Sequence, residues 1–383
     1  MSELYRKSNK IFRDNITWLI TSDIRIKDGH NKGGLYGWKN LSDSSFPFVY
    51  SEITGYAITA FVWLYSEMGD PIALRAAKEA SEWIRNNMNR YLVVARLTND
   101  FTDSTLSELL YSFDNGMIMI GLINMYRQTG QRQFLRLAEK IMDALIRHFF
   151  DGEKLIARLD NSYRPLTSDY EGNIVKWSTI SGAYHCKLSI GLLELAKATH
   201  NELYKDVSNS LCEYAIKLQK SNGQFITNPG SNISYLHPHL YACEGLIYSG
   251  LKQSNDIHYS AGINGIRWAI EKLLSKNTPA LCRDTQSTSV EQSDCTAQLL
   301  RLLILCRSTL RNYLKPSVLE NIAERLLSRL FDFYIPAGEG KGAMRYQFAL
   351  ETACSWCTMF TMQALRLWSV RKSIRSAWID YFI

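Results

Sequence analysis

The sequence lacks the short motifs that mark several large protein classes. The phosphate-binding patterns GxxxxGK[ST] and GxGxxG do not occur, nor does the GxSxG motif of serine hydrolases. There is no HExxH helix and no paired CxxC frame of the kind that binds zinc. Nucleotide binding and serine-hydrolase chemistry therefore have no motif support, and we predict neither a metal nor a cofactor.

Long apolar runs are also missing. No uncharged apolar run is long enough to span a membrane. The first residues, Met1–Lys7, are not followed by the apolar segment of a secretory signal. The eight cysteines are scattered, and several of them, such as Cys186, Cys243 and Cys306, fall within helical patterns. Cysteines of this kind are typical of reduced, buried side chains, so we expect a cytoplasmic protein without a membrane span.

Two further absences concern charge and linkers. The net charge of +7 is spread along the chain without the basic run that nucleic-acid binding requires. We expect no nucleic-acid partner, although the charge is compatible with an anionic substrate. No Pro/Ser/Gly-rich linker divides the 383 residues, which favours a single domain over residues 1–383. The sequence does not indicate the oligomeric state.

What the sequence does contain is a helical-hairpin unit that recurs about every sixty residues. Apolar segments without a polar stripe must be buried on all sides, whereas amphipathic segments keep one face in water. The apolar segments are 52–68, 114–129, 181–199, 236–250, 292–307 and 352–369, and the amphipathic segments are 3–21, 71–88, 131–149, 201–220, 259–275 and 315–331.

This alternation predicts an all-α (α/α)6 barrel, in which a ring of buried helices lies inside a ring of half-buried ones. The N-terminal helix would pair with the last inner helix and close the ring. A TPR or HEAT solenoid is the alternative, but its repeats are shorter, about 34 to 47 residues, and lack the strict alternation.

The connections differ at the two ends of the hairpins. Inner-to-outer turns are mostly short, whereas outer-to-inner connections are long, and several begin with glycine and a strand-like run, as in Gly33–Tyr36 and Gly223–Ile226. Long ordered loops are uncommon unless they are functional. We therefore predict one elaborated mouth with short β-like pieces, which contains the site, and one plain face.

Polar residues gather where the apolar helices start. Glu52 and Glu244 lie in or beside apolar helices, where an unpaired carboxylate would be costly. For Asp114 and Asp294, helix capping and catalysis are both open. Capping is the expected role of four further residues, namely Ser51, Ser178, Ser293 and Thr352.

Two local motifs have more than one interpretation. The two histidines of His237-Pro238-His239 could bind a metal, act as bases in sugar chemistry or be structural, and the lack of a third ligand disfavours the metal. Cys354 and Cys357 have CxxC spacing, but their apolar helical context favours packing over redox chemistry. Aromatic residues in the long connections, such as Trp38 and Trp177, could stack on sugar rings or pack the loops.

Five helix-start segments together resemble the motifs of (α/α)6 six-hairpin proteins, and in particular a poorly characterised group associated with bacterial polysaccharide clusters. The segments are Tyr50–Tyr56, Phe113–Gly116, Ser181–Tyr184, Leu236–Leu246 and Ser293–Gln298. This superfamily includes glycoside hydrolases such as unsaturated glucuronyl hydrolases, polysaccharide lyases, and N-acylglucosamine and cellobiose 2-epimerases. The resemblance implies the fold but does not choose among these reactions. The zinc motifs of two other toroid families, lanthionine cyclases and prenyltransferase β-subunits, have no match.

The leading hypothesis is a carbohydrate-active enzyme, a glycoside hydrolase acting on an oligosaccharide or surface-polysaccharide unit. Such a reaction needs two carboxyl groups, and we assign Asp114 as acid/base with Glu52 or Asp294 opposite, and His237 and His239 as further catalytic candidates. The expected substrate-binding residues are Tyr50, Trp38, Trp177, His185, Tyr241, Gln298, Arg345 and Trp356.

Two alternatives stay open. An epimerase or polysaccharide lyase would remove a proton beside a carbonyl or carboxylate, which suits a His or Tyr base. The candidate bases are His237, His239, Tyr241 and His185, and Arg345 or Arg283 would hold an acidic sugar. The other alternative is a toroid that binds a glycan or a protein without catalysis.

Overall fold

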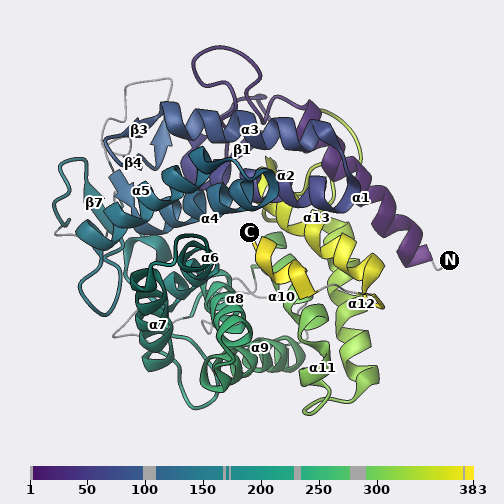
Figure 1. Ribbon diagram of the computed structural model, residues 1–383. Coiled ribbons are helices and arrows are strands. Elements are labelled where there is room, and N and C mark those ends of the chain that lie inside the picture. The colour runs from purple at the N-terminus through teal and green to yellow at the C-terminus, as the bar shows by residue number, and fades with distance from the viewer. Residues whose placement is uncertain are drawn as a thin grey trace.

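The computed structural model describes residues 3–97, 109–166, 170–171, 174–227, 234–276, 290–373 and 376–383. Within this part of the chain, two concentric rings of helices surround a common axis (Figure 1). The inner ring contains α2 (Ser51–Met68), α4 (Ser112–Thr129), η3 (Ala183–Leu188) continued by α6 (Ser189–Thr199), α8 (Leu236–Gln253), α10 (Ser293–Leu305) and α13 (Ser355–Val370).

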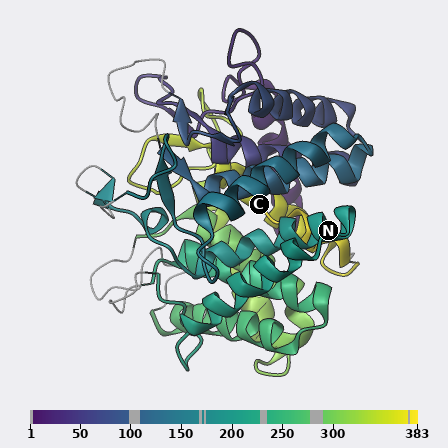
Figure 2. The same cartoon turned by 60° about the vertical axis from the view of Figure 1, so that its left-hand side comes forward.

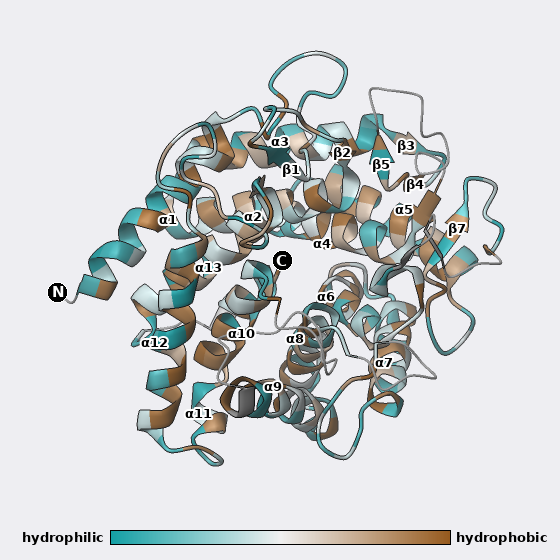
Figure 3. Ribbon diagram, turned by 180° about the vertical axis from the view of Figure 1, so that it is seen from behind, coloured by the Kyte–Doolittle hydropathy of each residue, from teal (hydrophilic) through white to brown (hydrophobic). Residues whose placement is uncertain are grey.

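The outer ring confirms the predicted (α/α)6 architecture. Its helices are α1 (Glu3–Thr21), α3 (Pro71–Asn86), α5 (Arg132–Phe149), α7 (Glu202–Lys217), α9 (Asp256–Lys276) and α12 (Pro316–Phe333), and a short α11 (Arg307–Leu310) precedes α12. The ring closes as predicted, because α1 packs against α13. Viewed from behind, outer helices such as α12 present hydrophilic residues outward (Figure 3).

Burial explains why each kind of sequence takes its place. In α5 the stripe Phe134, Ala138, Ile141, Leu145 and Phe149 is buried together with Met142 and Ala144, and the other residues are half-buried or exposed. In α4, by contrast, every residue from Ser112 to Met125 is buried. None of the described helices has the length and hydropathy needed to cross a bilayer.

One face of the toroid is plain. Several inner helices end there in a left-handed residue, as at Gly69 with φ 70° and Gly130 with φ 69°. The next helix then starts within a few residues, and Asp70 caps α3 by accepting the Ile72 N–H at 2.8 Å. These tight turns leave little room for a site.

The opposite mouth carries the short strands that the sequence predicts (Figure 2). Two pairs, β2 with β5 and β6 with β7, join loops of neighbouring hairpins, and β1 with β10 joins the first loop to the last; the other two pairs lie within one loop each. All pairs are antiparallel: β1 (Trp38–Asn40) with β10 (Thr352–Cys354), β2 (Val49–Tyr50) with β5 (Arg96–Leu97), β3 (Met88–Asn89) with β4 (Leu92–Val93), β6 (Leu109–Tyr111) with β7 (Arg158–Asp160), and β8 (Tyr170–Glu171) with β9 (Ile174–Val175).

Glycines fix two of these loops against outer helices. Gly33 has φ 92°, and a Cβ there would lie 2.2 Å from the carbonyl oxygen of Glu79 in α3. Gly223 has φ 94°, and its Cβ would lie 2.3 Å from the carbonyl oxygen of Asn264 in α9. Only glycine combines that backbone conformation with so close an approach, so both turns rest directly on the outer ring.

The predicted capping role of the helix-start residues is wrong for Ser51 and Ser293. The N-cap positions are Tyr50 and Gln292, and neither side chain makes a capping hydrogen bond. Ser51 and Ser293 are instead the first helical residues of α2 and α10. Thr352 belongs to strand β10, and Ser178 lies inside the short 3-10 helix η2 (Trp177–Thr179).

These first serines connect each hairpin to the loop of the next one. The Ser51 Oγ donates to the carbonyl of Ala95 at 3.1 Å, in the loop that leads to α4. In α13, the Ser355 Oγ donates to the carbonyl of Gly37 at 2.5 Å, in the loop that leads to α2. Ser112 and Ser293 make the corresponding bonds to the loops before η3 and α13. The serines therefore fasten the ring rather than cap single helices.

Candidate active site

The second residue of every inner helix lies at the elaborated mouth, around the axis. These six residues are Glu52, Phe113, Tyr184, His237, Asp294 and Trp356. Neighbours in this set are linked by contacts: the Phe113 and Tyr184 ring centroids are 5.2 Å apart, and the Trp356 Nε1 donates to Asp294 at 3.0 Å. These six residues span 305 positions of the sequence but lie together at the mouth. We call the surface that they form the floor of the candidate site.

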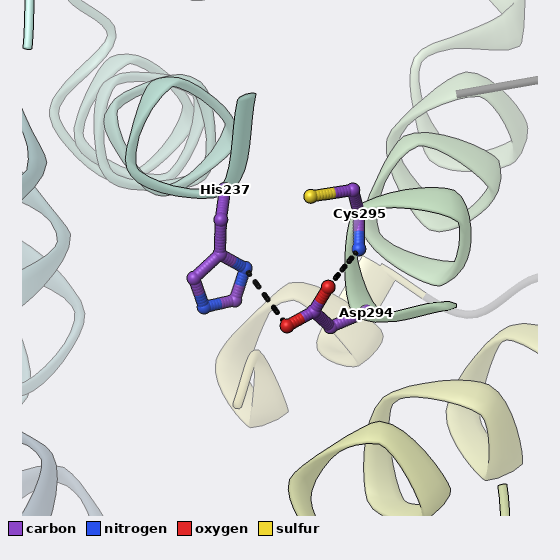
Figure 4. A group of neighbouring side chains, drawn as sticks. All are labelled: His237, Asp294 and Cys295. Carbon is purple, nitrogen blue, oxygen red and sulfur yellow. Dashed lines mark hydrogen bonds and ion pairs between the residues drawn. The ribbon is translucent and has the colours of Figure 1, made fainter. Parts of the chain in front are cut away.

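Asp294 is the centre of one half of this floor (Figure 4). Its Oδ1 accepts the Cys295 N–H at 2.7 Å, and its Oδ2 accepts the Trp356 indole N–H and lies 3.8 Å from the His237 Nδ1. The same Nδ1 is 2.6 Å from the Gln298 Oε1. Because an amide oxygen only accepts hydrogen bonds, this contact places a proton on Nδ1 and leaves the Nε2 of a neutral ring with a lone pair.

Asp294 and two of its neighbours also form a group of potential metal ligands. The His237 Nδ1, a carboxylate oxygen of Asp294 and the Cys295 Sγ all lie within 4.8 Å of one another, so they could hold a cation. However, Nδ1 and both carboxylate oxygens already have hydrogen-bond partners. A metal ion would have to displace these hydrogen bonds. That the protein binds no metal stays a prediction.

Glu52 is the centre of the other half. It is 6% exposed and accepts a hydrogen bond from the Tyr56 hydroxyl at 2.7 Å. The Tyr56 hydroxyl in turn lies 2.5 Å from the Tyr241 hydroxyl. Burial is the main cause that raises the pKa of both phenols well above 10, and the negative charge of Glu52 is the second cause. Tyr56 and Tyr241 are therefore neutral hydrogen-bonding groups at physiological pH.

Asp114 and Glu52 lie on two inner helices, α4 and α2, that approach each other closely. A Cβ at Gly55 would lie 2.7 Å from the backbone nitrogen of Ile118. Glu52 and Asp114 precede this contact by about one helical turn on their respective helices. Burial is the main cause that raises the pKa of Tyr50, and the charges of Glu52 and Asp114 raise it further. Asp114 is 2% exposed, so two buried acids from neighbouring inner helices act on Tyr50.

Aromatic side chains cover the floor. The Trp38 and Trp356 rings meet edge to face, with their centroids 6.1 Å apart. Phe48 contacts both Trp38 and Tyr50. On the other side, Trp177 lies 5.8 Å from the His237 ring. Aromatic rings in such offset contacts form a continuous apolar surface, and the structure thus brings the predicted tryptophans together with the acids.

Two other predicted residues, Arg345 and Arg283, add little to the description of the site. Arg345 is half-buried in the loop before β10, where its carbonyl accepts a hydrogen bond from Ser293. Arg283 lies outside the described residues.

His239 takes a structural position instead of the predicted catalytic one. Its Nδ1 accepts the Phe225 N–H at 3.2 Å, and its Nε2 lies 2.9 Å from the carbonyl oxygen of Gly265. As the fourth residue of α8 it corresponds to Thr54 in α2 and Asn115 in α4, which accept backbone N–H groups of their loops in the same way. Both ring nitrogens are occupied, so the geometry does not support catalysis.

His185 is not part of the floor either. It is 1% exposed, its Nε2 lies 2.9 Å from the Ser112 Oγ, and its Nδ1 accepts the Gly182 N–H at 3.5 Å. Burial lowers its pKa to about 3 and that of His239 to about 4. We therefore interpret both histidines as neutral structural residues rather than the predicted substrate-binding or catalytic ones.

The low pKa values of these two histidines predict that the protein loses stability at acidic pH. The unfolded chain binds a proton at each imidazole below pH 6.5, whereas folded His239 stays neutral down to about pH 4. The free energy of unfolding should therefore fall as the pH drops through this window. Replacing His239 with Asn, the residue that Asn115 provides in α4, should make the fall between pH 6.5 and 4 smaller by about 3 kcal/mol. Urea unfolding at several pH values measures this. The exposed His30→Asn is the control, and equal pH slopes for both variants would contradict the assignment.

The sequence pointed to most of the candidate site but missed two residues close to the floor, Tyr56 and Lys187. Tyr56 lies four positions after Glu52, so it is one turn further along the same helix face. Lys187 is fully buried in the inner ring, and a lone lysine in an apolar segment was the signal that could have revealed it.

Comparison with known proteins agrees with this architecture. Residues 24–177 match the sequence profile of glycosyl hydrolase family 76. No curated protein sequence matches the chain.

The similar solved structures are toroids that act on sugars. A sugar epimerase from a ruminal bacterium superposes with a TM-score of 0.73 at 14% identity, over 94% of this chain and 98% of the other. The cellobiose 2-epimerase of Bacillus thermoamylovorans B4167 gives 0.73 at 11% identity, over 94% and 99%. An unsaturated glucuronyl hydrolase specific for heparin gives 0.67 at 13%, over 97% and 98%. The chain thus has the (α/α)6 toroid fold of the six-hairpin glycosidase-like proteins, and residues 24–177 resemble glycosyl hydrolase family 76.

Proposed function

We propose that this protein is a glycoside hydrolase that acts on an oligosaccharide or surface-polysaccharide unit. The observation that carries the proposal is that two buried acids, Glu52 and Asp114, lie near the starts of the neighbouring helices α2 and α4 and both act on Tyr50. Both acids lie within residues 24–177, the part of the chain that matches glycosyl hydrolase family 76.

Each acid has a distinct role in this proposal. Hydrolysis needs one carboxylic acid to protonate the leaving oxygen and a second carboxylate on the opposite side of the bond. We assign Asp114 as the acid/base. Glu52, oriented by the hydroxyl of Tyr56, is the second carboxylate. Trp38, Trp177 and Trp356 would pack against the sugar rings.

A second candidate function is supported by the geometry of His237. Its Nδ1 faces Gln298 and Asp294, and its side chain is 12% exposed. An imidazole oriented in this way can remove a proton with its Nε2, as an epimerase requires. Two of the similar solved structures named above are sugar epimerases.

Product analysis separates the candidates. We expect incubation with a panel of neutral and uronate-containing oligosaccharides to release new reducing ends from at least one member. Deuterium uptake at one sugar carbon without cleavage would instead indicate an epimerase, and a new ultraviolet-absorbing unsaturated uronate a lyase. Saturable glycan binding with none of these products would overturn the enzymatic proposal and leave a binding protein. The same panel tests whether the substrate is anionic.

A further inference from the structure

The C-terminal segment occupies the axis of the toroid. The 3-10 helix η4 (Ser376–Tyr381) and residues 382–383 run into the centre of the ring (Figure 1). We call residues 378–383 the axial plug. It contacts each of the inner helices, through Trp63 of α2, Arg127 of α4, Lys187 of η3, Lys252 of α8, Arg301 of α10 and Gln363 of α13.

The inner end of the plug meets a buried charge cluster. Lys187, Glu244 and Arg301 have no exposed side-chain surface. The Lys187 Nζ donates to Glu244 at 2.7 Å and to the backbone oxygen of Ile383 at 2.6 Å. Arg301 donates to the same two residues. An ammonium group at such depth is costly unless it is fully bonded, so the backbone oxygen of Ile383 helps to hold Lys187 in place.

Lys187 also contacts Tyr241, whose ring packs against Phe113 and His237 of the floor. Its Nζ lies 4.0 Å from the centre of the Tyr241 ring, a distance at which a cation is attracted to the ring face. The Tyr241 hydroxyl contacts that of Tyr56, which donates to Glu52. A continuous path of contacts therefore connects the axial plug to a candidate catalytic carboxylate.

The charges around Lys187 come from several helices. Glu244 and Tyr241 face it from α8, Arg301 from α10, and Glu52 and Tyr56 from α2. Of these, Glu244 bonds the ammonium directly, and Glu52 acts on it at longer range. Lys187 is thus the cation through which the buried cluster acts on the carboxylate of the floor.

We propose that Lys187 is a positioning residue of the active site, held by the axial plug, and that it orients Glu52 through Tyr241 and Tyr56. This inference rests on the proposed function in one respect, namely that Glu52 takes part in catalysis. The contact path itself does not depend on the reaction.

The test compares two lysines that bind the same plug. Lys187→Met removes the ammonium beneath the floor, whereas Lys252→Met removes one that reaches the plug through Asp380 at 2.6 Å and is 34% exposed. On a confirmed glycan substrate, we expect Lys187→Met to lower kcat about thirtyfold or more with KM within about threefold. Lys252→Met should leave kcat within about twofold. Equal kcat values for the two variants would overturn the proposal.

The pH profile provides a readout in the unmodified chain. Burial lowers the pKa of Lys187 to about 8, so kcat of the wild type should fall as the pH rises past this value. Lys187→Arg keeps the positive charge at alkaline pH. Its kcat should be higher than that of Lys187→Met, and it should not fall at alkaline pH as the wild-type kcat does. A wild-type kcat that stays level from pH 7 to pH 9.5, or an identical profile for Lys187→Arg, would contradict the positioning role.

Hydrogen exchange separates failure of this inference from failure of the proposed function. If no glycan is hydrolysed, the hydrolase proposal fails, but the contact path can still be examined. We then expect faster amide exchange in residues 50–56 and 236–244 for Lys187→Met and not for Lys252→Met. Unchanged exchange at these floor segments in Lys187→Met would overturn the positioning role whatever the reaction.

Discussion

Replacing Asp114 with Asn is expected to lower kcat about a thousandfold on a confirmed glycan substrate, because the amide cannot protonate the leaving oxygen. Asn has nearly the same size as Asp, so the buried side chain should keep its packing and the variant should still bind the substrate. Initial rates of reducing-end release, with binding followed by calorimetry, measure both effects. Glu52→Gln should show a comparable loss.

The control for this experiment is Asp43→Asn. Asp43 lies in the exposed loop after β1, where it accepts hydrogen bonds from Ser45, and its replacement should leave kcat unchanged. A loss of less than about tenfold for Asp114→Asn would exclude Asp114 as the acid/base. If the loss appeared for His237→Gln and not for Asp114→Asn, the epimerase candidate would be favoured.

Replacing Glu244 with Gln is expected to lower the free energy of unfolding by about 3 to 5 kcal/mol, because it leaves two buried cations without their anion. Glu244 accepts from Lys187 at 2.7 Å and from Arg301 at 2.7 Å, and all three side chains are fully buried. An amide of the same shape keeps only one of the two oxygens, so it can accept from one of the two cations in the present geometry and supplies no charge. Urea unfolding at neutral pH measures the difference.

An exposed ion pair serves as the comparison. Glu153 lies 2.6 Å from Lys217, with 49% of its side chain in water. Exposed pairs contribute little because water and salt screen them, so Glu153→Gln should leave the unfolding free energy unchanged. A similar small effect for Glu244→Gln would mean that the buried cluster does not stabilise the centre of the toroid.

The architecture could be predicted from the sequence because burial leaves a direct trace in it. Inner helices such as α4 need apolar residues all round, and outer helices such as α5 need a single stripe. The roles of helix-start residues could not be predicted in the same way. Ser51 looks like a capping residue in sequence, but its partner is the carbonyl of Ala95, 44 positions away. Such a partner is known only once the hairpins are arranged in space.

The positions of four acidic and histidine residues at the mouth could be predicted from the sequence, but the geometry of the candidate site could not. Glu52, Asp114, His237 and Asp294 were all expected at the elaborated mouth, and the structure places them there. The sequence could not separate His237 from His239, although they are two positions apart. That separation depends on helical rotation: the second residue of α8 faces the axis, and the fourth faces the loop around Phe225.

The pairing of β1 with β10, which joins the first loop to the last, bears on how a protein of this kind can diversify. A solenoid can gain or lose repeats at its ends, because each repeat contacts only its neighbours. Here every hairpin already has two neighbours, and an added hairpin would have to open both rings and move the axial plug away from the six inner helices it contacts. Variation is therefore confined to the long connections at one mouth. A change of substrate can be built there without altering the number of hairpins.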